Sequence, residues 1–379
     1  MEPREPGSDT SVIKNISHEA LTGLMGAKNP QINNSMDIKK LFSKFALLSA
    51  LTAAFSTTSC NTVFEPEGDC SVHYQVKFRY DMNMKFADAF PNTVPYVTVQ
   101  VYDPQTGKLV LRQTDGGEAL TREGYALELE GLEPGTYDIV AWCGDGLRDG
   151  KFSVPDAVAG YSPMEDLTCT MKRKDGGLVN EDTGQLYHGK TRVEFKETYG
   201  THATTINLTK NTNVVRVVLQ HLSGLDVNPD DFTFEIKDEN GFMAHDNTVL
   251  EDEVITYNPW SVTAGSASID ADIYGNTKTQ TSVSVALAEF TVGRLVTENN
   301  PVLSIYNVKE DNKQILAIPL KDYALLVKGY YNRSMSDQEY LDRQDEYNLT
   351  FFLDEHGNWV SSRIIINSWH LVLQDTELK

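Results

Sequence analysis

The chain has 379 residues, and its formal net charge at pH 7 is −21. This acidic balance disfavours nucleic-acid binding, which needs a basic footprint, and it disfavours docking on anionic lipid by charge. Forty per cent of the residues are hydrophobic, which is enough to build packed cores in a chain long enough for two domains of ordinary size.

The first predicted element is a secretory signal peptide over residues 36–59. The run 45–55 is apolar, too short for a membrane-spanning helix of about 20 residues but suited to the hydrophobic region of a signal. Three lysines precede it (Lys39, Lys40 and Lys44), and Met36 stands where a start is expected. Residues 1–35 show no sustained apolar period. We expect them to be an upstream extension that is disordered or not translated.

The signal ends on a cysteine. The stretch Ser-Thr-Thr-Ser before Cys60 resembles a bacterial lipoprotein box, in which the chain is cut just before the cysteine and the cysteine is acylated, for example with palmitate. Thr57 stands where leucine is usual, and the alternative is an ordinary secreted protein cut near Ala54. Each buried acyl CH₂ contributes about 0.8 kcal/mol. An acylated Cys60 would therefore hold the chain on a membrane through a polar tether at 60–70.

Three further cysteines follow, at Cys70, Cys143 and Cys169. An odd number outside the cytoplasm leaves one disulfide and a free thiol, or no disulfide. Cys143–Cys169 is the preferred pair, and the alternative is three small buried residues. Their spacings match no zinc pattern, and we expect neither a metal nor a cofactor.

Short alternating strands come next. Residues 72–80 (VHYQVKFRY) alternate strictly between apolar and polar side chains, which predicts a half-buried strand. The run 97–101 leads through an Asp-Pro and Gly turn at 103–107 into a predicted hairpin. Further strands are predicted at 125–130 and 137–142.

A second series of strands follows the first. It comprises 213–219, 232–237, 282–287 and the apolar run 364–373. Many short strands with turn signals about every ten residues predict an all-β fold of sandwich type. Two such series predict two sandwiches in tandem, over residues 71–207 and 208–379. Residues 330–345 are predicted to form a loop or a short helix.

Catalytic motifs are missing from the sequence. It contains no Gly-rich phosphate loop, no H-E-x-x-H and no G-x-S-x-G, so we expect no enzyme. Asp81 and Asn83 do not make a calcium loop because Lys85 occupies the fifth position; with Asp88 they are predicted to cap a turn.

Tryptophans are the remaining candidates for a binding surface. Trp142, at the end of an alternating strand, is predicted to be a core aromatic and not a platform for a sugar. Trp359 and Trp369 could pack either in the domain's own core or in the groove of a neighbouring subunit.

Three segments carry a family resemblance. They are residues 80–90 (YDMNMKFADAF), 135–144 (GTYDIVAWCG) and 208–217 (LTKNTNVVRV). Together they resemble the FimB-type fimbrium-anchoring subunits of Bacteroidales bacteria. The resemblance implies an outer-membrane lipoprotein with two transthyretin-like β-sandwiches that faces the cell surface, sits at the base of a fimbrium and limits its length. It implies a fimbrial stalk subunit as partner, and no nucleic acid, cofactor or small-molecule substrate.

The same resemblance implies assembly by strand exchange. A stalk subunit loses its first strand to an arginine-directed protease, and a neighbour's strand fills the groove by β-augmentation. We expect an anchor to keep its first strand instead, although Arg79, Arg148 and Arg173 are candidate cleavage sites. The stalk contact would then use another element. The candidate lies in the last apolar run and comprises Ile364, Ile366, Trp369, Leu371 and Leu373.

Other interpretations stay open at this point. The run 364–373 is equally compatible with a plain last strand of the second sandwich. The whole chain is also compatible with a fimbrial tip or minor subunit, or with a surface lipoprotein that binds glycans.

Overall fold

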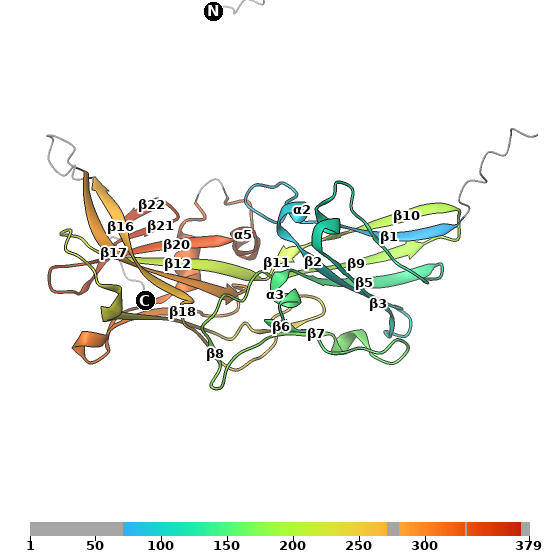
Figure 1. The fold of residues 1–379 in the computed structure, drawn as a ribbon, viewed down its shortest axis with the longest axis horizontal. Coiled ribbons are helices and arrows are strands. Elements are labelled where there is room, and N and C mark those ends of the chain that lie inside the picture. The colour runs from blue at the N-terminus through green and yellow to red at the C-terminus, as the bar shows by residue number, and fades with distance from the viewer. Residues whose placement is uncertain (1–70, 271–279, 330–331, 373–379) are drawn as a thin grey trace, which may run out of the picture. The chain divides into compact units, whose positions relative to one another are not determined.

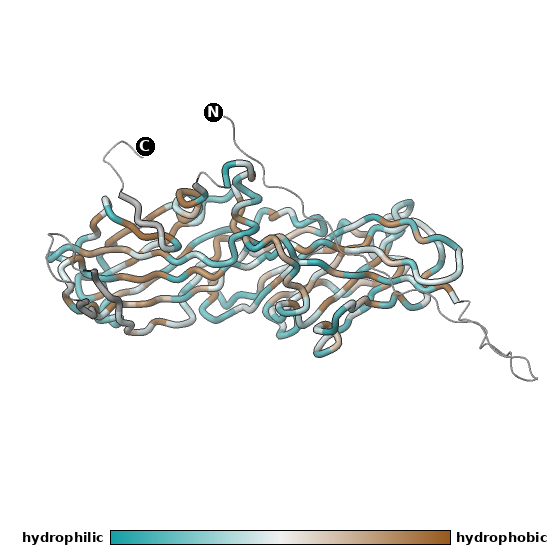
Figure 2. The backbone as a smooth tube through the Cα atoms, turned by 90° about the horizontal axis from the view of Figure 1, so that it is seen from above, coloured by the Kyte–Doolittle hydropathy of each residue, from teal (hydrophilic) through white to brown (hydrophobic). Residues whose placement is uncertain are grey.

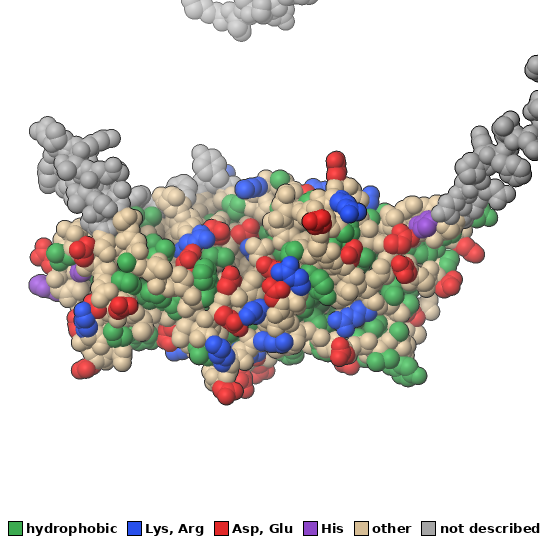
Figure 3. All heavy atoms as spheres, in the orientation of Figure 1, with side chains coloured by type: hydrophobic (Ala, Val, Ile, Leu, Met, Phe, Trp, Pro, Cys, Tyr) green, Lys and Arg blue, Asp and Glu red, His purple; other side chains and the backbone are tan. Residues whose placement is uncertain are grey.

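The computed structural model describes residues 71–270, 280–329 and 332–372, and its regular elements are mainly β-strands (Figure 1). The all-β prediction is confirmed. The strands form five sheets, and hydrophobic stretches lie along the strands whereas the connecting loops are largely hydrophilic (Figure 2). Acidic and basic side chains are interspersed on the face shown in Figure 3 and do not gather into one basic patch.

The first sheet has three strands in the order β10, β1, β4. Its central strand β1 (Val72–Arg79) lies between β10 (Gly200–Asn207) and β4 (Leu127–Glu128). The expected alternation of this strand is confirmed, since Tyr74, Val76 and Phe78 are buried.

A five-stranded sheet packs against it in the order β11, β9, β5, β2, β3. The strands are β11 (Thr209–Lys210), β9 (Tyr187–Phe195), β5 (Gly135–Cys143), β2 (Tyr96–Tyr102) and β3 (Leu109–Gly116). The predicted hairpin is confirmed: β2 pairs with β3 across a turn that ends at Gly107, where φ is +70°. Short helical turns accompany these strands: α2 (Phe90–Thr93), η1 (Gly117–Thr121), α3 (Asp145–Arg148) and η2 (Met164–Asp166).

The largest sheet has six strands in the order β16, β17, β12, β20, β21, β22. They are β16 (Ser261–Asp270), β17 (Gln280–Gly293), β12 (Thr212–His221), β20 (Glu346–Leu353), β21 (Trp359–Ile366) and β22 (Trp369–Val372). Facing it is a sheet in the order β19, β18, β13, β15, β8. Its strands are β19 (Lys313–Pro319), β18 (Val302–Asn307), β13 (Phe232–Asp238), β15 (Ile255–Tyr257) and β8 (Leu178–Val179).

A second three-stranded sheet joins strands that lie far apart in the sequence, in the order β14, β7, β6. They are β14 (Phe242–Ala244), β7 (Thr168–Met171) and β6 (Phe152–Ser153). β7 pairs with β14, and β8 pairs with β15. Two strands from before residue 207 therefore belong to the same sheets as strands from after it. The division at 207/208 stays a prediction, and it does not separate the sheets.

Helical elements of the later part are α4 (Leu320–Leu326), α5 (Asp337–Arg343), η3 (Pro229–Asp231) and η4 (Val308–Glu310). Residues 330–345 were predicted to be a loop or a short helix, and within them 337–343 form the helix α5. Ser336 caps it by accepting a hydrogen bond from the Glu339 amide, as the preference for serine at this position predicts.

Two hydrophobic cores fill the described part of the chain. The first core includes Tyr74, Val76 and Ile139, and the second includes Val140, Trp142 and Phe351. Consecutive residues of β5 therefore point into different cores. This explains why β5 carries a continuous apolar run and why β2 is buried almost along its whole length, although the sequence of β2 alternates like a strand with one wet face.

Candidate subunit interface and retained first strand

The first strand is the best-defined candidate element. Every residue of β1, from Val72 opposite Gly200 to Arg79 opposite Asn207, pairs in parallel with β10. On its other side, Gln75 and Val76 pair with β4. β1 is thus paired with β10 along its whole length and with β4 at two residues, and three of its side chains are buried, so the groove holds the protein's own strand.

Polar side chains also fix β1 in its place between the neighbouring strands. Glu128 of β4 accepts a hydrogen bond from Gln75 Nε2 at 2.9 Å, and its other carboxylate oxygen lies 2.8 Å from His73 Nδ1. The Tyr74 hydroxyl donates to the Lys196 carbonyl at 3.1 Å. The strand is thereby joined through side chains to β4 and to the segment between β9 and β10.

The end of the first strand is tied to residues near the C-terminus. The Tyr80 hydroxyl donates a hydrogen bond of 2.7 Å to Asp345 Oδ1, and Lys210 Nζ lies 3.7 Å from the same oxygen. Burial, reinforced by the negative charge of Asp345, raises the pKa of Tyr80 far above its ordinary value. The hydroxyl therefore remains a donor at any physiological pH.

Arg343, at the end of α5, makes a second link to the same region. Its guanidinium donates to the Asp81 carbonyl at 2.9 Å and lies 4.3 Å from the centre of the Phe86 ring. This cation–π contact explains how Phe86 tolerates its 56% exposure. The segment that follows β1 is thus held by α5.

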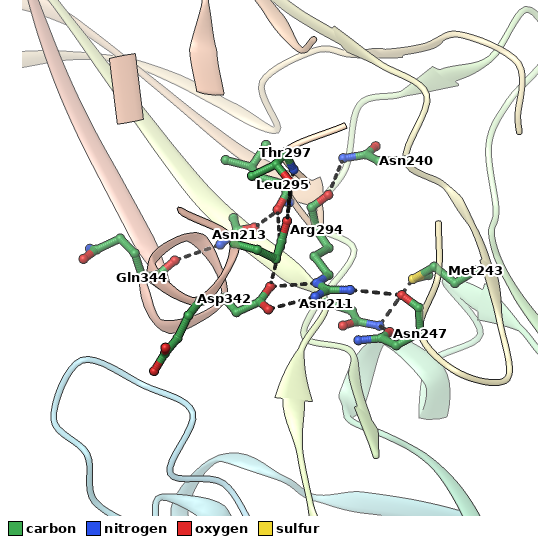
Figure 4. Close-up of polar contacts among 12 residues, drawn as sticks. Asn211, Asn213, Asn240, Met243, Asn247, Arg294, Leu295, Thr297, Asp342 and Gln344 are labelled. Carbon is green, nitrogen blue, oxygen red and sulfur yellow. Dashed lines mark hydrogen bonds and ion pairs between the residues drawn. The ribbon is translucent and has the colours of Figure 1, made fainter. Parts of the chain in front are cut away.

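A network of polar side chains lies nearby, between β12, the segment after β17 and α5 (Figure 4). Arg294 donates two hydrogen bonds to the Asp342 carboxylate, at 2.7 and 2.8 Å, and a third to the Asn247 carbonyl at 3.0 Å. Asn213 donates to the Gln344 carbonyl at 2.8 Å. Both charged side chains of the pair are nearly buried, at 13% and 10% exposure, so their mutual pairing is required to offset desolvation.

A polar cavity of about 620 Å³ opens beside this network and is lined by residues that include His188, Asn207, Arg294 and Gln338. Burial lowers the pKa of His188 to about 4, and the Nε2 atom of this ring lies 2.9 Å from the His245 carbonyl oxygen. A neutral His188 must donate this hydrogen bond from Nε2. The cavity carries no cluster suited to a metal: in the ranges that the structure covers, no group of three or more His, Cys, Asp and Glu side chains is arranged to hold an ion.

The candidate cleavage sites are poorly presented to a protease. The Arg79 carbonyl accepts a hydrogen bond from the Leu208 amide at 2.8 Å, and its side chain pairs with Asp81 at 2.7 Å. Arg173 makes two hydrogen bonds to Asp252. Arg148 lies on the short helix α3 and pairs with its neighbour Asp149. Proteases bind their substrates as extended strands, so the paired strand that ends at Arg79 and the helix at Arg148 are not free to bind in that way. Arg173 lies between β7 and β8, and only its side-chain contact with Asp252 opposes access.

The last apolar run differs from the single strand that was predicted. It bends at Asn367 and Ser368, where φ is positive, and so forms β21 and β22. Ile364 and Ile366 are buried, and β21 is paired on both sides; these residues are part of the protein's own core. β22, which carries Trp369 and Leu371, forms the edge of its sheet. Leu373, like Cys60, lies outside the described residues.

The two internal cysteines are free thiols in the structure. Cys143 belongs to the first core and Cys169 to the second, and burial raises the pKa of each thiol well above its ordinary value. Their pairing stays a prediction for which the structure provides no bond.

Two smaller predictions are confirmed. Trp142 is a core residue at 1% exposure. Asp88 accepts hydrogen bonds from the Tyr80 and Phe90 amides, and Asn83 accepts one from Lys85, as expected of turn caps. The Asp81 carboxylate, which was predicted to cap with them, instead pairs with Arg79 at 2.7 Å. Trp359 packs against the second core. Within the described residues there is no helix long and apolar enough to cross a membrane.

Sequence reasoning missed Asp345, Arg343 and Arg294. They are scattered charged residues without a motif, and their importance comes from burial and from partners far away in the chain. Because acidic residues are frequent throughout the chain, the sequence alone does not distinguish Asp345 from the others.

Comparisons with known proteins agree with this fold. The family model of the fimbrillin-A associated anchor proteins Mfa1 and Mfa2 matches residues 66–375. A Bacteroides thetaiotaomicron structure described as a candidate adhesin is 32% identical, covers 79% of this chain and 97% of its own, and superposes with a TM-score of 0.70. Another from the same organism, described as a candidate polysaccharide-binding protein, is 31% identical over 80% and 99%, with a TM-score of 0.68.

A more distant structure shares the fold. The fimbrial anchor protein Mfa2 from Porphyromonas gingivalis is 18% identical, covers 80% of this chain and 100% of its own, and superposes with a TM-score of 0.60. No curated protein sequence matches. This family is one of structural, fimbria-associated proteins of the cell envelope, not of enzymes. From the extent of the family match and from the two relatives above 30% identity, the chain belongs to the family of fimbrillin-A associated anchor proteins.

Proposed function

We propose that this protein is an outer-membrane lipoprotein that anchors a fimbrium to the cell surface and ends its assembly. The observation that carries the proposal is the complete pairing of β1 with β10. A groove that is already filled by the protein's own strand does not accept a donated strand. The polymer would therefore stop growing at this subunit.

The same strand gives the anchor its physical continuity. Cys60 precedes Val72 by only a short tether, and β1 continues directly into Tyr80, which is bonded to Asp345. An acylated Cys60 would thus be joined to both cores through one uninterrupted chain. Removal of β1 would release the protein from its lipid, which gives an anchor reason to resist cleavage.

The contact with the stalk subunit is proposed to use the C-terminal edge. β22 pairs only with β21 among the described strands, so its other side offers backbone groups to an added strand. Trp369 and Leu371 belong to this edge, with Leu373 just beyond it. Ile364 and Ile366 would support it from within the core.

Deletion of the gene in the native host tests the function. We expect long filaments and fimbrial subunit in the medium, whereas the wild type keeps the subunit in the cell-bound fraction. A Cys60→Ala variant should release the protein together with its fimbriae, and a Cys70→Ala variant serves as the matched control. Unchanged fractions in the deletion strain would overturn the proposal and favour the glycan-binding alternative.

N-terminal sequencing of the mature protein separates base from tip. An anchor should begin at Cys60 and keep β1. A chain that begins after Arg79 would have an open groove, which is the state expected of a tip or minor subunit.

A further inference from the structure

The two most exposed large hydrophobic side chains of the described chain are both tyrosines of the N-terminal half. Tyr199 is 81% and Tyr161 is 78% exposed, and Val158, at 60%, comes next. A single exposed apolar side chain is ordinary on a protein surface. What these three residues have in common is their position in the fold.

The strand register places Tyr199 at one end of the five-stranded sheet, together with the turn between β2 and β3. Tyr102 at the end of β2 pairs with Leu109 at the start of β3 and with Asp138 near the start of β5. The start of β5 pairs in turn with the end of β9. Tyr199 lies in the short segment between the end of β9 and the start of β10, so it shares this end of the sheet with the turn.

The loop that carries Val158 and Tyr161 is fixed to the same end. The Gly160 amide donates a hydrogen bond of 2.7 Å to the Leu109 carbonyl, and the Leu109 amide donates one of 2.8 Å to the Ser162 carbonyl. The Ser162 hydroxyl accepts a further bond from the Val158 amide at 2.9 Å. Hydrophobic side chains gather at the lower right of Figure 3, where this loop lies in Figure 1. Because its backbone is bonded to the sheet, the loop loses little conformational entropy when a partner covers it.

The chain also enters the fold at this end. The Gly200 amide, next to Tyr199, donates a hydrogen bond of 3.2 Å to the Ser71 carbonyl, just before β1 begins. Residues 61–70 separate Ser71 from Cys60, and a stretch of this length spans at most about 40 Å when fully extended. A lipid on Cys60 would therefore lie within about 40 Å of the start of β1.

The side chains at this end suit an uncharged lipid surface. Glu194 and Glu197 lie on either side of Lys196 in the exposed stretch before β10, so an anionic surface is not attracted. A tyrosine side chain combines an apolar ring with a polar hydroxyl, and such side chains are enriched at the boundary between lipid and water. Contact through rings and not through charge is what this composition favours.

We propose that this end of the molecule rests on the lipid surface to which the tether leads, with Tyr199, Tyr161 and Val158 as the contacting side chains. The inference rests on the proposed acylation of Cys60 and adds a defined orientation to it. Three side chains alone bind a membrane weakly, but a short tether keeps them near the surface at a millimolar effective concentration. The C-terminal half, on the side away from the start of β1 (Figure 1), would then point away from the membrane.

Oxidative footprinting on vesicles tests this contact. The acylated protein is purified from its native membranes and placed in phosphatidylcholine vesicles, and the Cys60→Ala protein in solution is the reference. Hydroxyl radicals oxidise exposed aromatic rings, so we expect Tyr161 and Tyr199 to react several-fold more slowly on vesicles. Phe86, which is 56% exposed beside α5, should react equally in both states. Equal rates for the two tyrosines on vesicles and in solution overturn the proposal.

The mass of the N-terminal peptide from the same sample separates this result from a failure of the anchoring function. An acylated Cys60 with tyrosines that remain exposed means that the contact is wrong while the lipid anchor stands. A Cys60 without an acyl group overturns both. Protection that grows with the density of protein on the vesicle also overturns the contact, because a second copy of the protein would then cover the tyrosines.

Substitutions provide the second arm. Tyr161→Asp combined with Tyr199→Asp should lift this end from the lipid, so that Val158 is oxidised as fast on vesicles as in solution. Leu222→Asp combined with Leu225→Asp makes the matched change at two exposed leucines of the C-terminal half and should leave Val158 protected. Thermal unfolding checks that both variants fold. Loss of Val158 protection in both variants, or in neither, overturns the assignment of these side chains.

Discussion

The Tyr80 hydroxyl lies 2.7 Å from Asp345 Oδ1, across 265 positions of the sequence. The bond joins the end of the first strand to the start of β20, and both residues lie where the two cores approach each other. Tyr80 also packs edge-on against Tyr187, at 4.9 Å between ring centres. The first strand is therefore integrated into the C-terminal half and not only into its own sheet.

Removal of this hydroxyl should lower stability without loss of the fold. Tyr80→Phe keeps the ring packing and deletes one hydrogen bond to a charged group. We expect the free energy of unfolding to fall by about 1–3 kcal/mol, measured by urea denaturation at pH 7. Tyr161→Phe, at a side chain that is 78% exposed, is the control and should change nothing. Equal stability of the two variants would show that the bond contributes nothing.

The buried ion pair of Figure 4 should be far more sensitive than a surface pair. Asp342→Ala leaves the Arg294 guanidinium nearly buried without its carboxylate, and such a loss costs about 3–5 kcal/mol. Asp149→Ala removes the exposed partner of Arg148 and should leave the unfolding temperature almost unchanged, because water and salt screen an exposed pair. Thermal unfolding of both variants measures the difference. A similar, small effect in both would contradict the role assigned to Arg294 and Asp342.

Asp238 should impose a pH dependence on stability. Burial raises its pKa to about 6, and one carboxylate oxygen finds no hydrogen-bond partner among the residues that the structure describes. Because the folded pKa exceeds the unfolded one, the stabilisation is complete below about pH 4 and is lost as pH rises to about 6. Asp238→Asn stays neutral, so its unfolding free energy should lack this decline, which amounts to roughly 1–3 kcal/mol. Parallel pH profiles of wild type and variant would refute the assignment.

The buried cysteines should resist alkylation in the folded protein. Cys143 and Cys169 are inaccessible, and their raised pKa values keep them as thiols. Iodoacetamide should label both only after unfolding, as read by peptide mass mapping without reductant. A disulfide-linked pair of peptides containing these two residues would instead establish the bond expected from the sequence.

An arginine-specific protease should spare the first strand. Arg79 is the last paired residue of β1, opposite Asn207, whereas Arg122 is exposed in the loop after η1. Limited digestion should therefore cut after Arg122 long before Arg79, as followed by intact-mass measurement. Early loss of the segment that ends at Arg79 would mean that the groove of β1 opens readily, and the proposed mechanism of termination would fail.

The alternation of apolar and polar residues predicted where the strands lie, but not which of their faces would be covered by a second core. The alternation in β1 foretold its buried and exposed faces correctly, because only one side of that strand meets a core. In β2 the same alternation suggested a wet face for Thr98 and Gln100, yet both are buried at 2% and 1% exposure. The second core contacts that face, and it is built partly from residues more than a hundred positions later. No local period carries this information.

The candidate site was predicted only in part for a related reason. The first strand and its cysteine-bearing leader are contiguous in the sequence, so they could be recognised together. The bend at Asn367 and Ser368 depends on backbone dihedrals with positive φ. Asparagine adopts positive φ more readily than most residues, but its presence alone does not predict a bend. The contact between Arg343 and Asp81 joins residues 262 positions apart. No local spacing pattern in the sequence predicts such a contact.

The parallel pairing of β1 with β10 also has a mechanical consequence. A pull on the proposed lipid tether would enter the domain at Val72, where β1 begins, and would act along the strand axis. Under such a load all eight pairs between the two strands are strained at once in shear, whereas a hairpin pulled from its open end gives way one pair at a time. The start of β1 is thus arranged to resist force along the strand, as the proposed anchoring of a filament requires.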